Sequence, residues 1–246
     1  ITIKSEREIE LMTEAGRILG IVHKELEKAL KPGMSTLDID ALGEEVIRSY
    51  GCEPSFLNYN GYPASICVSV NDEIVHGIPS AKHLIKEGDI VSLDAGVIYK
   101  GYHSDAARTH AVGEIRPDLQ KLIDVTRESF FEGIKFAKEG NHLYDISRAI
   151  GDYAESFGYG VVRELCGHGI GTSLHESPEI PNFQMRRRGM TLAIEPMVNL
   201  GTERIRWMSD NWTVVTADRK ESAHYENTIL ITKDEPKILS IADGNV

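Results

Sequence analysis

The sequence predicts an α+β fold made of two similar halves, because the same order of elements occurs twice along the chain. In each half, two helix patterns precede a series of short strand patterns. The second helices of the two halves also match at four positions, each pair being 107 residues apart: Gly33 and Gly140, Asp38 and Asp145, Ile39 and Ile146, Gly51 and Gly158. Four matches at one offset indicate an internal duplication.

The first half begins with two helix patterns. Apolar residues recur at helix spacing from Ile9 to Val22, and "KPG" ends this pattern. The second helix begins at "STLDID", with Ser35 or Thr36 as its N-cap, and ends at Gly51. Strand patterns follow at "SICVSV", "EIVHGIP", "DIVSLDAGVIY" and "YHSDAARTHAVG".

The second half repeats this order. A long helix is predicted over 119–138, where "EG" stops it, and a second one over 143–157, which ends before Gly158. Strand patterns follow at "VVREL", "TLAIEPMVNL", "WTVVTA" and "ENTILIT". Both halves carry acidic residues in corresponding strands. We therefore expect a single domain over 1–246, whose halves, roughly 1–116 and 117–246, face each other across a pseudo-two-fold axis.

Composition limits the class of protein. The chain is 41% hydrophobic and 26% charged, which is typical of a globular protein, and no apolar run is long enough to span a membrane. Its first residues, charged from Lys4, do not suggest a secretory signal. The net charge of -11 argues against sequence-specific nucleic-acid binding. The basic run Arg186–Arg188 fits a solvated loop or a docking patch. Three cysteines without a C-x-x-C pair favour reduced thiols in the cytoplasm.

Four acids and one histidine stand out as candidate ligands. Asp94 in "VSLDAG" and Glu195 in "LAIEPM" lie in apolar strand patterns, where burying an isolated carboxylate is costly. Cationic partners, protonation or metal ions could each remove that cost. Asp105 and Glu226 lie in strands that could pair beside them, and His168 lies in "GHG". Together these side chains could hold two divalent transition metals, whose charge would relieve the mutual repulsion of the carboxylates.

Each candidate also has a purely structural interpretation. Asp94 could be a turn residue, Asp105 and Glu226 could face solvent, and His168 could be a loop histidine with satisfied hydrogen bonds. The matched placement of the acids in the two halves favours the metal cage over these alternatives.

Six motifs carry a resemblance to a known family: "NGYPASICVSVNDEIVHGIP", "GDIVSLDAG", "GYHSDAARTHAVG", "GHGIGTSLHESP", "AIEPMV" and "NWTVVTADRKESAHYENT". These motifs are specific to that family, and the resemblance covers nearly the whole chain. The chain resembles the type I methionine aminopeptidases of the short bacterial form. That resemblance implies the pita-bread fold, shared with prolidase, aminopeptidase P and creatinase, in which two pseudo-symmetric halves surround a curved antiparallel sheet with helices outside.

The resemblance also implies a set of ligands for two divalent ions, which could be Co, Mn, Fe or Zn. The implied ligands are Asp94, Asp105, His168, Glu195 and Glu226. Among them, Asp105 and Glu226 would bridge the two ions. A water shared by the ions would attack the peptide carbonyl, and Glu195 would pass a proton to the leaving amine.

Further residues are implied to contact the substrate. His175 would hydrogen-bond the scissile carbonyl, and His76 would contact the scissile amide or the residue after it. The walls of the methionine pocket would be Tyr59, Tyr62, Cys67, Trp212 and Phe56. Cys67 and Trp212 could equally be ordinary core residues.

The implied substrates are nascent polypeptide N-termini that begin with methionine and continue with a small residue. A monomer that comes transiently close to the ribosome is the corresponding expectation. Prolidase or aminopeptidase P is the nearest rival, but those enzymes usually carry an extra N-terminal domain. A non-catalytic pita-bread binding protein or a creatinase-like amidohydrolase are further rivals. Around Phe183 and Gln184 the chain is several residues shorter than we expect for the family.

Overall fold

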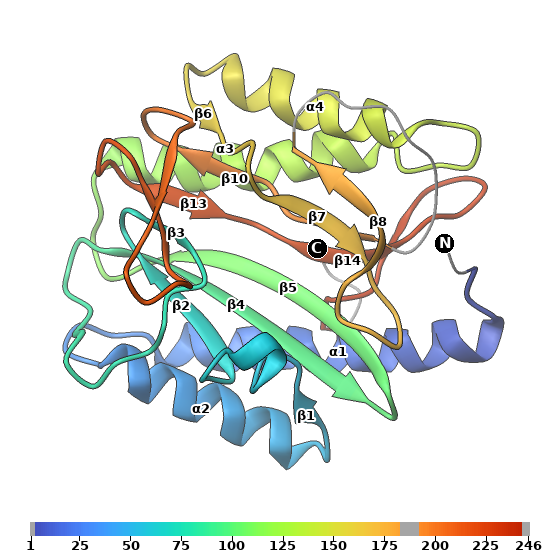
Figure 1. The fold of residues 1–246 in the computed structure, drawn as a ribbon, viewed down its shortest axis with the longest axis horizontal. Coiled ribbons are helices and arrows are strands. Elements are labelled where there is room, and N and C mark those ends of the chain that lie inside the picture. Colours follow the sequence, from blue (N-terminus) through green and yellow to red (C-terminus); the bar gives the residue numbers. More distant parts are fainter. Residues whose placement is uncertain (1–2, 183–191, 243–246) are drawn as a thin grey trace.

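The computed structural model describes residues 3–182 and 192–242. Helices cover two opposite sides of a central layer of strands, α1 and α2 on one side and α3 and α4 on the other (Figure 1). The short segment expected at Phe183 and Gln184 and the basic run Arg186–Arg188 both lie outside the described residues. Among the described residues, no helix has the length and apolarity needed to cross a membrane.

The helices of the first half form as predicted. Helix α1 (Glu6–Ala29) begins with a capping box, in which the Ser5 side chain accepts from the backbone N–H of Glu8 and the Glu8 side chain accepts from that of Ser5. Helix α2 (Thr36–Ser49) begins in the same way at Ser35. The apolar faces of both helices pack on strands β2, β4 and β5 and form the core of the first half.

The helices of the second half are α3 (Pro117–Ile134) and α4 (Leu143–Glu155). The prediction that the first of them reaches residue 138 was wrong. Beyond Ile134 the backbone turns toward the C-terminal part of the chain, where the Glu139 N–H donates to the Thr232 carbonyl. These two helices cover a second core cluster, which includes Phe130, Ile150 and Ile194.

The matched positions of the two halves occupy the same local conformations. Gly33 and Gly140 have φ values of 91° and 92°, in the left-handed region that glycine adopts without strain. Asp38 and Asp145 each accept a hydrogen bond from the N-cap backbone of their helix, at 2.9 and 3.0 Å. The repeated residues therefore serve as turn and cap residues, and the second helix of each half begins in the same way.

Within residues 3–182 and 192–242, the strands pair in four antiparallel groups. The first contains β1 (Glu53–Pro54), β2 (Ile66–Val70), β4 (Ile90–Tyr99) and β5 (Tyr102–Ala111). The second contains β6 (Gly160–Val161), β10 (Met197–Asn199) and β13 (Ser222–His224), and the third β3 (Glu73–Val75), β11 (Ile205–Trp207) and β12 (Val214–Thr216). The fourth contains β7 (Cys166–Gly169), β8 (Glu176–Pro181), β9 (Leu192–Ile194), β14 (Asn227–Leu230) and β15 (Lys237–Ile238).

Three strand predictions differ from the structure. "EIVHGIP" is a strand only as far as Val75, because His76 takes a left-handed conformation with φ 59°. "VVREL" contributes little more than Val161. "TLAIEPMVNL" is divided into β9 and β10 at Glu195 and Pro196, where proline has no N–H to donate to a sheet. Both interruptions lie at residues of the candidate site.

Gly16→Ala in α1 is expected to destabilise the protein, although alanine normally favours a helix interior over glycine. A Cβ at this position would lie 2.1 Å from the Leu239 carbonyl oxygen, because α1 packs directly on the backbone there. We expect a loss of about 2 kcal/mol in the free energy of unfolding, measured by urea denaturation. Gly151→Ala in α4 is the matched control, since its nearest atom would lie at 3.4 Å. Equal effects of the two substitutions would contradict the close approach at Gly16.

Candidate metal centre

A single cavity of about 430 Å³ collects every residue that the sequence and its resemblance single out. Both halves contribute to its walls. The residues that line it include Phe56, Tyr59, Tyr62, Cys67, His76, Asp94, Asp105, His168, His175, Glu195, Trp212 and Glu226.

The carboxylates reach the cavity from strands of both halves. Asp94 lies in the middle of β4 and Asp105 near the middle of β5, and these two strands form one long hairpin. Glu195 directly follows β9, and Glu226 directly precedes β14, the partner of β9. The interpretations of Asp94 as a turn residue and of Glu226 as a surface acid are therefore wrong, the latter because Glu226 is 2% exposed.

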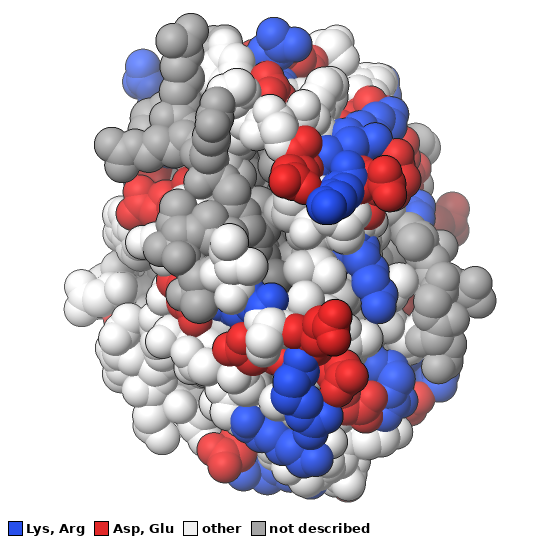
Figure 2. Space-filling view, turned by 90° about the vertical axis from the view of Figure 1, so that its right-hand side faces the viewer, with Lys and Arg blue, Asp and Glu red and all other residues white. Residues whose placement is uncertain are grey.

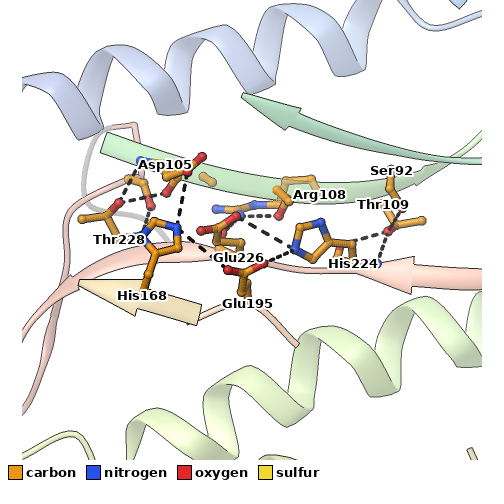
Figure 3. A network of polar contacts seen from close by, with 12 residues as sticks. Ser92, Asp105, Arg108, Thr109, His168, Glu195, His224, Glu226 and Thr228 are labelled. Atoms are coloured by element: carbon orange, nitrogen blue, oxygen red, sulfur yellow. Dashed lines mark hydrogen bonds and ion pairs between the residues drawn. The ribbon is translucent and has the colours of Figure 1, made fainter. Parts of the chain in front are cut away.

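His168 faces this carboxylate group with one ring nitrogen. Its Nδ1 lies 2.9 Å from the Gly169 carbonyl oxygen, to which it donates. The Nε2 atom therefore presents its lone pair, 3.8 Å from an Asp105 oxygen and 3.9 Å from a Glu195 oxygen (Figure 3). A histidine whose other nitrogen donates to a backbone carbonyl is the common arrangement of a metal ligand.

The glycines beside His168 are required by close backbone packing on both sides of the strand. A Cβ at Gly167 would lie 2.3 Å from the Ala193 carbonyl oxygen of β9, and one at Gly169 would lie 2.4 Å from the Ser177 carbonyl oxygen. The "GHG" segment is strand β7, and its glycines let the neighbouring backbones on both sides come close.

Burial makes the group of acids unfavourable without cations. Desolvation raises the pKa of Asp94 to about 7 and that of Glu195 to about 8. Burial, followed by the neighbouring carboxylates, raises the pKa of Asp105 and of Glu226 well above the ordinary values. Burial also lowers the pKa of His168 to about 3, so its imidazole is neutral and able to bind a metal.

The donor set fits divalent metal ions. One oxygen each of Asp94, Asp105 and Glu226 is buried without a hydrogen-bond partner among the described residues. Ligand atoms of Asp105, His168 and Glu226 all lie within 4.8 Å of one another. Carboxylate oxygens combined with one imidazole are suited to first-row transition metals.

His175 lies beside this group at the mouth of the cavity. Its ring centroid is 4.0 Å from that of His168, and its Nδ1 lies 2.9 Å from the Tyr59 hydroxyl. A hydroxyl that donates to Nδ1 leaves the ring proton on Nε2, which can then donate to a ligand. His76, in its strained left-handed conformation, packs edge-on against Trp212 at 6.2 Å.

The remaining wall is apolar and aromatic. Tyr62 is 3% exposed, packs edge-on against Trp212 at 5.1 Å and donates from its hydroxyl to the Gly77 carbonyl. Phe56, Cys67 and Leu174 belong to the same buried cluster. This end of the cavity can accept an unbranched apolar side chain.

Sequence reasoning missed three residues that support the cage. His224 is 1% exposed, and its Nε2 lies 3.6 Å from a Glu195 oxygen and 3.9 Å from a Glu226 oxygen. Arg108 donates to the Glu226 carbonyl and to the Asn227 side chain (Figure 3). Thr228 accepts from the Asp105 N–H and donates to the Asp105 carbonyl, both at 2.9 Å. The spacing of two residues between His224 and Glu226, which puts both side chains on one side of an extended chain, was the available signal.

The metal-free protein is expected to lose stability as the pH rises. The raised pKa values of Asp94 and Glu195 mean that the folded state binds more protons than the unfolded state between about pH 4 and about pH 8. The free energy of unfolding should fall by about 2 kcal/mol or more between about pH 5 and about pH 8. Denaturant unfolding of chelator-treated protein measures this fall. Asp94→Asn removes one charge at constant shape and should reduce this fall in the free energy of unfolding. An unchanged dependence on pH in the variant would contradict the raised pKa of Asp94.

Comparison with known proteins gives this geometry a family. The model of Metallopeptidase family M24 matches residues 10–233. The methionine aminopeptidase of Clostridium acetobutylicum is 52% identical over 249 residues, which cover 99% of this chain and 100% of that protein. Methionine aminopeptidase 1 of Bacillus subtilis is 48% identical, with coverage of 98% and 99%.

Solved structures agree with these relatives. The crystal structure of the methionine aminopeptidase from Thermotoga maritima has a TM-score of 0.95 and 43% identity, and the match covers 98% of this chain and 99% of that one. The prolidase from Pyrococcus furiosus has a TM-score of 0.80 at 23% identity and is covered over 66% of its length, which shows a shared fold alone. The expected pita-bread fold and the resemblance to methionine aminopeptidases are confirmed, and the chain belongs to Metallopeptidase family M24.

Proposed function

We propose that this protein is a methionine aminopeptidase, which hydrolyses the first peptide bond of chains that begin with methionine. The proposal rests on one observation: a buried carboxylate–imidazole cage and an aromatic pocket lie in the same cavity of about 430 Å³. Full-length relatives that are methionine aminopeptidases support the choice of substrate. The halves 1–116 and 117–246 act as one catalytic domain, because each contributes ligands to the same cage.

Two divalent ions are the proposed cofactors, and Asp105 and Glu226 would be among the residues that hold them. The other ligands are Asp94, His168 and Glu195. Co, Mn, Fe and Zn all suit this donor set. When bound, the ions polarise the scissile carbonyl, lower the pKa of water and hold the free amino group of the substrate.

The chain's own residues orient the peptide and move its protons. Nε2 of His175 donates to the scissile carbonyl oxygen as negative charge develops on it. His76 contacts the scissile amide or the next residue from the opposite wall of the cavity. Glu195 accepts a proton from the attacking water and returns it to the leaving amine. Its position at the break between β9 and β10 directs its side chain into the cavity.

The methionine side chain occupies the aromatic end of the cavity. Tyr59, Tyr62, Phe56, Cys67 and Trp212 form this end. Aromatic rings make favourable contacts with a thioether sulfur, and the unbranched side chain fits a narrow pocket. A confined space beyond the scissile bond would admit only small second residues.

The proposed setting is the cytoplasm, where the protein acts as a monomer on nascent chains close to the ribosome. Cys52, Cys67 and Cys166 are all free thiols, which is consistent with a reducing compartment. On the face viewed in Figure 2, acidic and basic side chains are interspersed rather than gathered into one broad basic surface. On the described part of this face, the charges therefore do not form the broad basic surface that nucleic-acid binding requires.

Mass spectrometry on three peptides tests the function. Peptides that begin with Met-Ala, Met-Leu and Ala-Pro would be incubated with metal-loaded protein and with protein after chelation. We expect metal-dependent loss of methionine from the Met-Ala peptide alone. Cleavage only before proline would move the assignment to the prolidases. No cleavage of any peptide by protein with bound metal would favour a binding module.

A further inference from the structure

A second cavity, of about 290 Å³, lies where α1 of the first half meets α3 of the second. Strand β5 and the segment 240–242 complete its walls. Its polar lining contrasts with the net charge of -11 on the chain. The charged and imidazole side chains that line it are Lys24, Arg108, Arg127, Glu27, His23, His110 and His224.

We propose that this basic cavity binds a phosphate group, as inorganic phosphate or as part of a small phosphate ester. Three cationic side chains and a single carboxylate line it, so the local charge is positive. None of its residues is among the five proposed ligands of the metal cage or the walls of the peptide pocket, but His224 and Arg108 also contact residues of the cage.

Arg108 supplies the first part of the argument. Its guanidinium makes three hydrogen bonds, to the carbonyls of Ala107 and Glu226 and to the side-chain oxygen of Asn227, and it stacks over the Tyr225 ring at 4.4 Å. All three acceptors are neutral oxygens. A guanidinium has five N–H donors, so two remain for a ligand, and its positive charge favours an anionic one.

The histidines supply the second part. His23 is 6% exposed and donates from Nε2 to the Ala106 carbonyl at 2.9 Å. Its Nδ1 is buried without a partner among the described residues, and so is Nε2 of His110. With its proton on Nε2, His23 presents a lone pair at Nδ1, which requires a donor from the ligand. A buried nitrogen without a partner is costly, so a ligand that satisfies it is favoured.

The two requirements together favour an oxyanion that keeps an O–H group near neutral pH, as phosphate does. A hydrogen phosphate or a singly protonated phosphate ester carries charged oxygens for Arg108 and Arg127 and an O–H group for His23. A carboxylate or sulfate carries the charge but has no proton to donate near neutral pH. The volume of the cavity exceeds that of a phosphate ion, so it can also accept a small group esterified to it.

Isothermal titration calorimetry with inorganic phosphate tests the proposal on the full chain, both metal-loaded and after metal removal. Removing the metals separates this cavity from phosphate bound by the ions of the cage. We expect one site with a Kd of about 1 mM or lower in both forms. Sulfate should bind at least about fivefold more weakly, because it lacks the donor that His23 requires.

Arg127→Gln should weaken phosphate binding about tenfold, equivalent to about 1.4 kcal/mol. Arg127 is exposed on α3, so its replacement leaves the fold intact, and His110→Gln should give a similar loss from a second wall. Arg148→Gln on α4 is the matched control and should bind phosphate as the unaltered protein does. Absence of phosphate binding, equal affinity for sulfate, or unchanged affinity in the Arg127 variant would each overturn the proposal.

Discussion

Glu226→Gln is expected to abolish both the retention of metal and the peptidase activity. Glu226 is 2% exposed, and its carboxylate belongs to both groups of potential ligands, with Asp105 and His168 on one side and Glu195 and His224 on the other. An amide of the same shape cannot supply the negative charge that two cations share. We expect a fall in kcat/KM of at least about a thousandfold, or about 4 kcal/mol of transition-state stabilisation.

Metal content after dialysis is measured by elemental analysis. Together with the stability of the variant, it distinguishes a loss of metal binding from a loss of the fold. The metal-free variant should be at least as stable as the metal-free parent near pH 8, because one buried charge is gone. Glu221→Gln is the control: it makes the same substitution five residues earlier, in a residue that pairs with Arg116 at 3.1 Å and does not line the cavity. Full metal content in the Glu226 variant would contradict its role as a bridging ligand.

The helices and the candidate site were predictable from sequence because both depend on local patterns. Ser35 and Asp38 form the cap that the sequence suggests, and the same roles recur 107 residues later at His142 and Asp145. The duplication also indicated that both halves contribute acidic residues from corresponding strands. Asp94 and Glu195 are conspicuous because a carboxylate in an apolar strand requires compensation.

Other features depend on contacts between distant segments, which a single sequence does not reveal. The end of α3 is set by the pairing of residue 139 with Thr232, not by its own helix pattern. His224 was overlooked because its role depends on a contact with Glu195, which lies 29 residues earlier in the sequence, between β9 and β10. Arg108 sits in a segment where the resemblance singles out only Asp105, yet it joins β5 to the backbone beside Glu226. The basic cavity also arises only when α1 and α3 are brought together.

His175→Asn is expected to lower kcat by about a hundredfold or more while the metal content stays unchanged. His175 lines the cavity beside His168 but is not among the proposed ligands, so its loss should affect the reaction and not the cage. Burial lowers the pKa of His175, which keeps the imidazole neutral near neutral pH. A neutral ring with its proton on Nε2 can donate to the carbonyl oxygen, and this hydrogen bond strengthens as negative charge develops there in the transition state.

Tyr59→Phe tests how that proton is directed. The Tyr59 hydroxyl lies 2.9 Å from Nδ1 of His175, and the two rings stack at 5.3 Å. Phenylalanine keeps the stacking and removes the hydrogen bond, so kcat should fall by about tenfold with little change in KM. His83→Asn, at a half-buried histidine outside the cavity, should leave both constants unchanged. If His175→Asn instead raised KM at constant kcat, His175 would bind the substrate and its transition state equally, and its role in stabilising the developing charge would be contradicted.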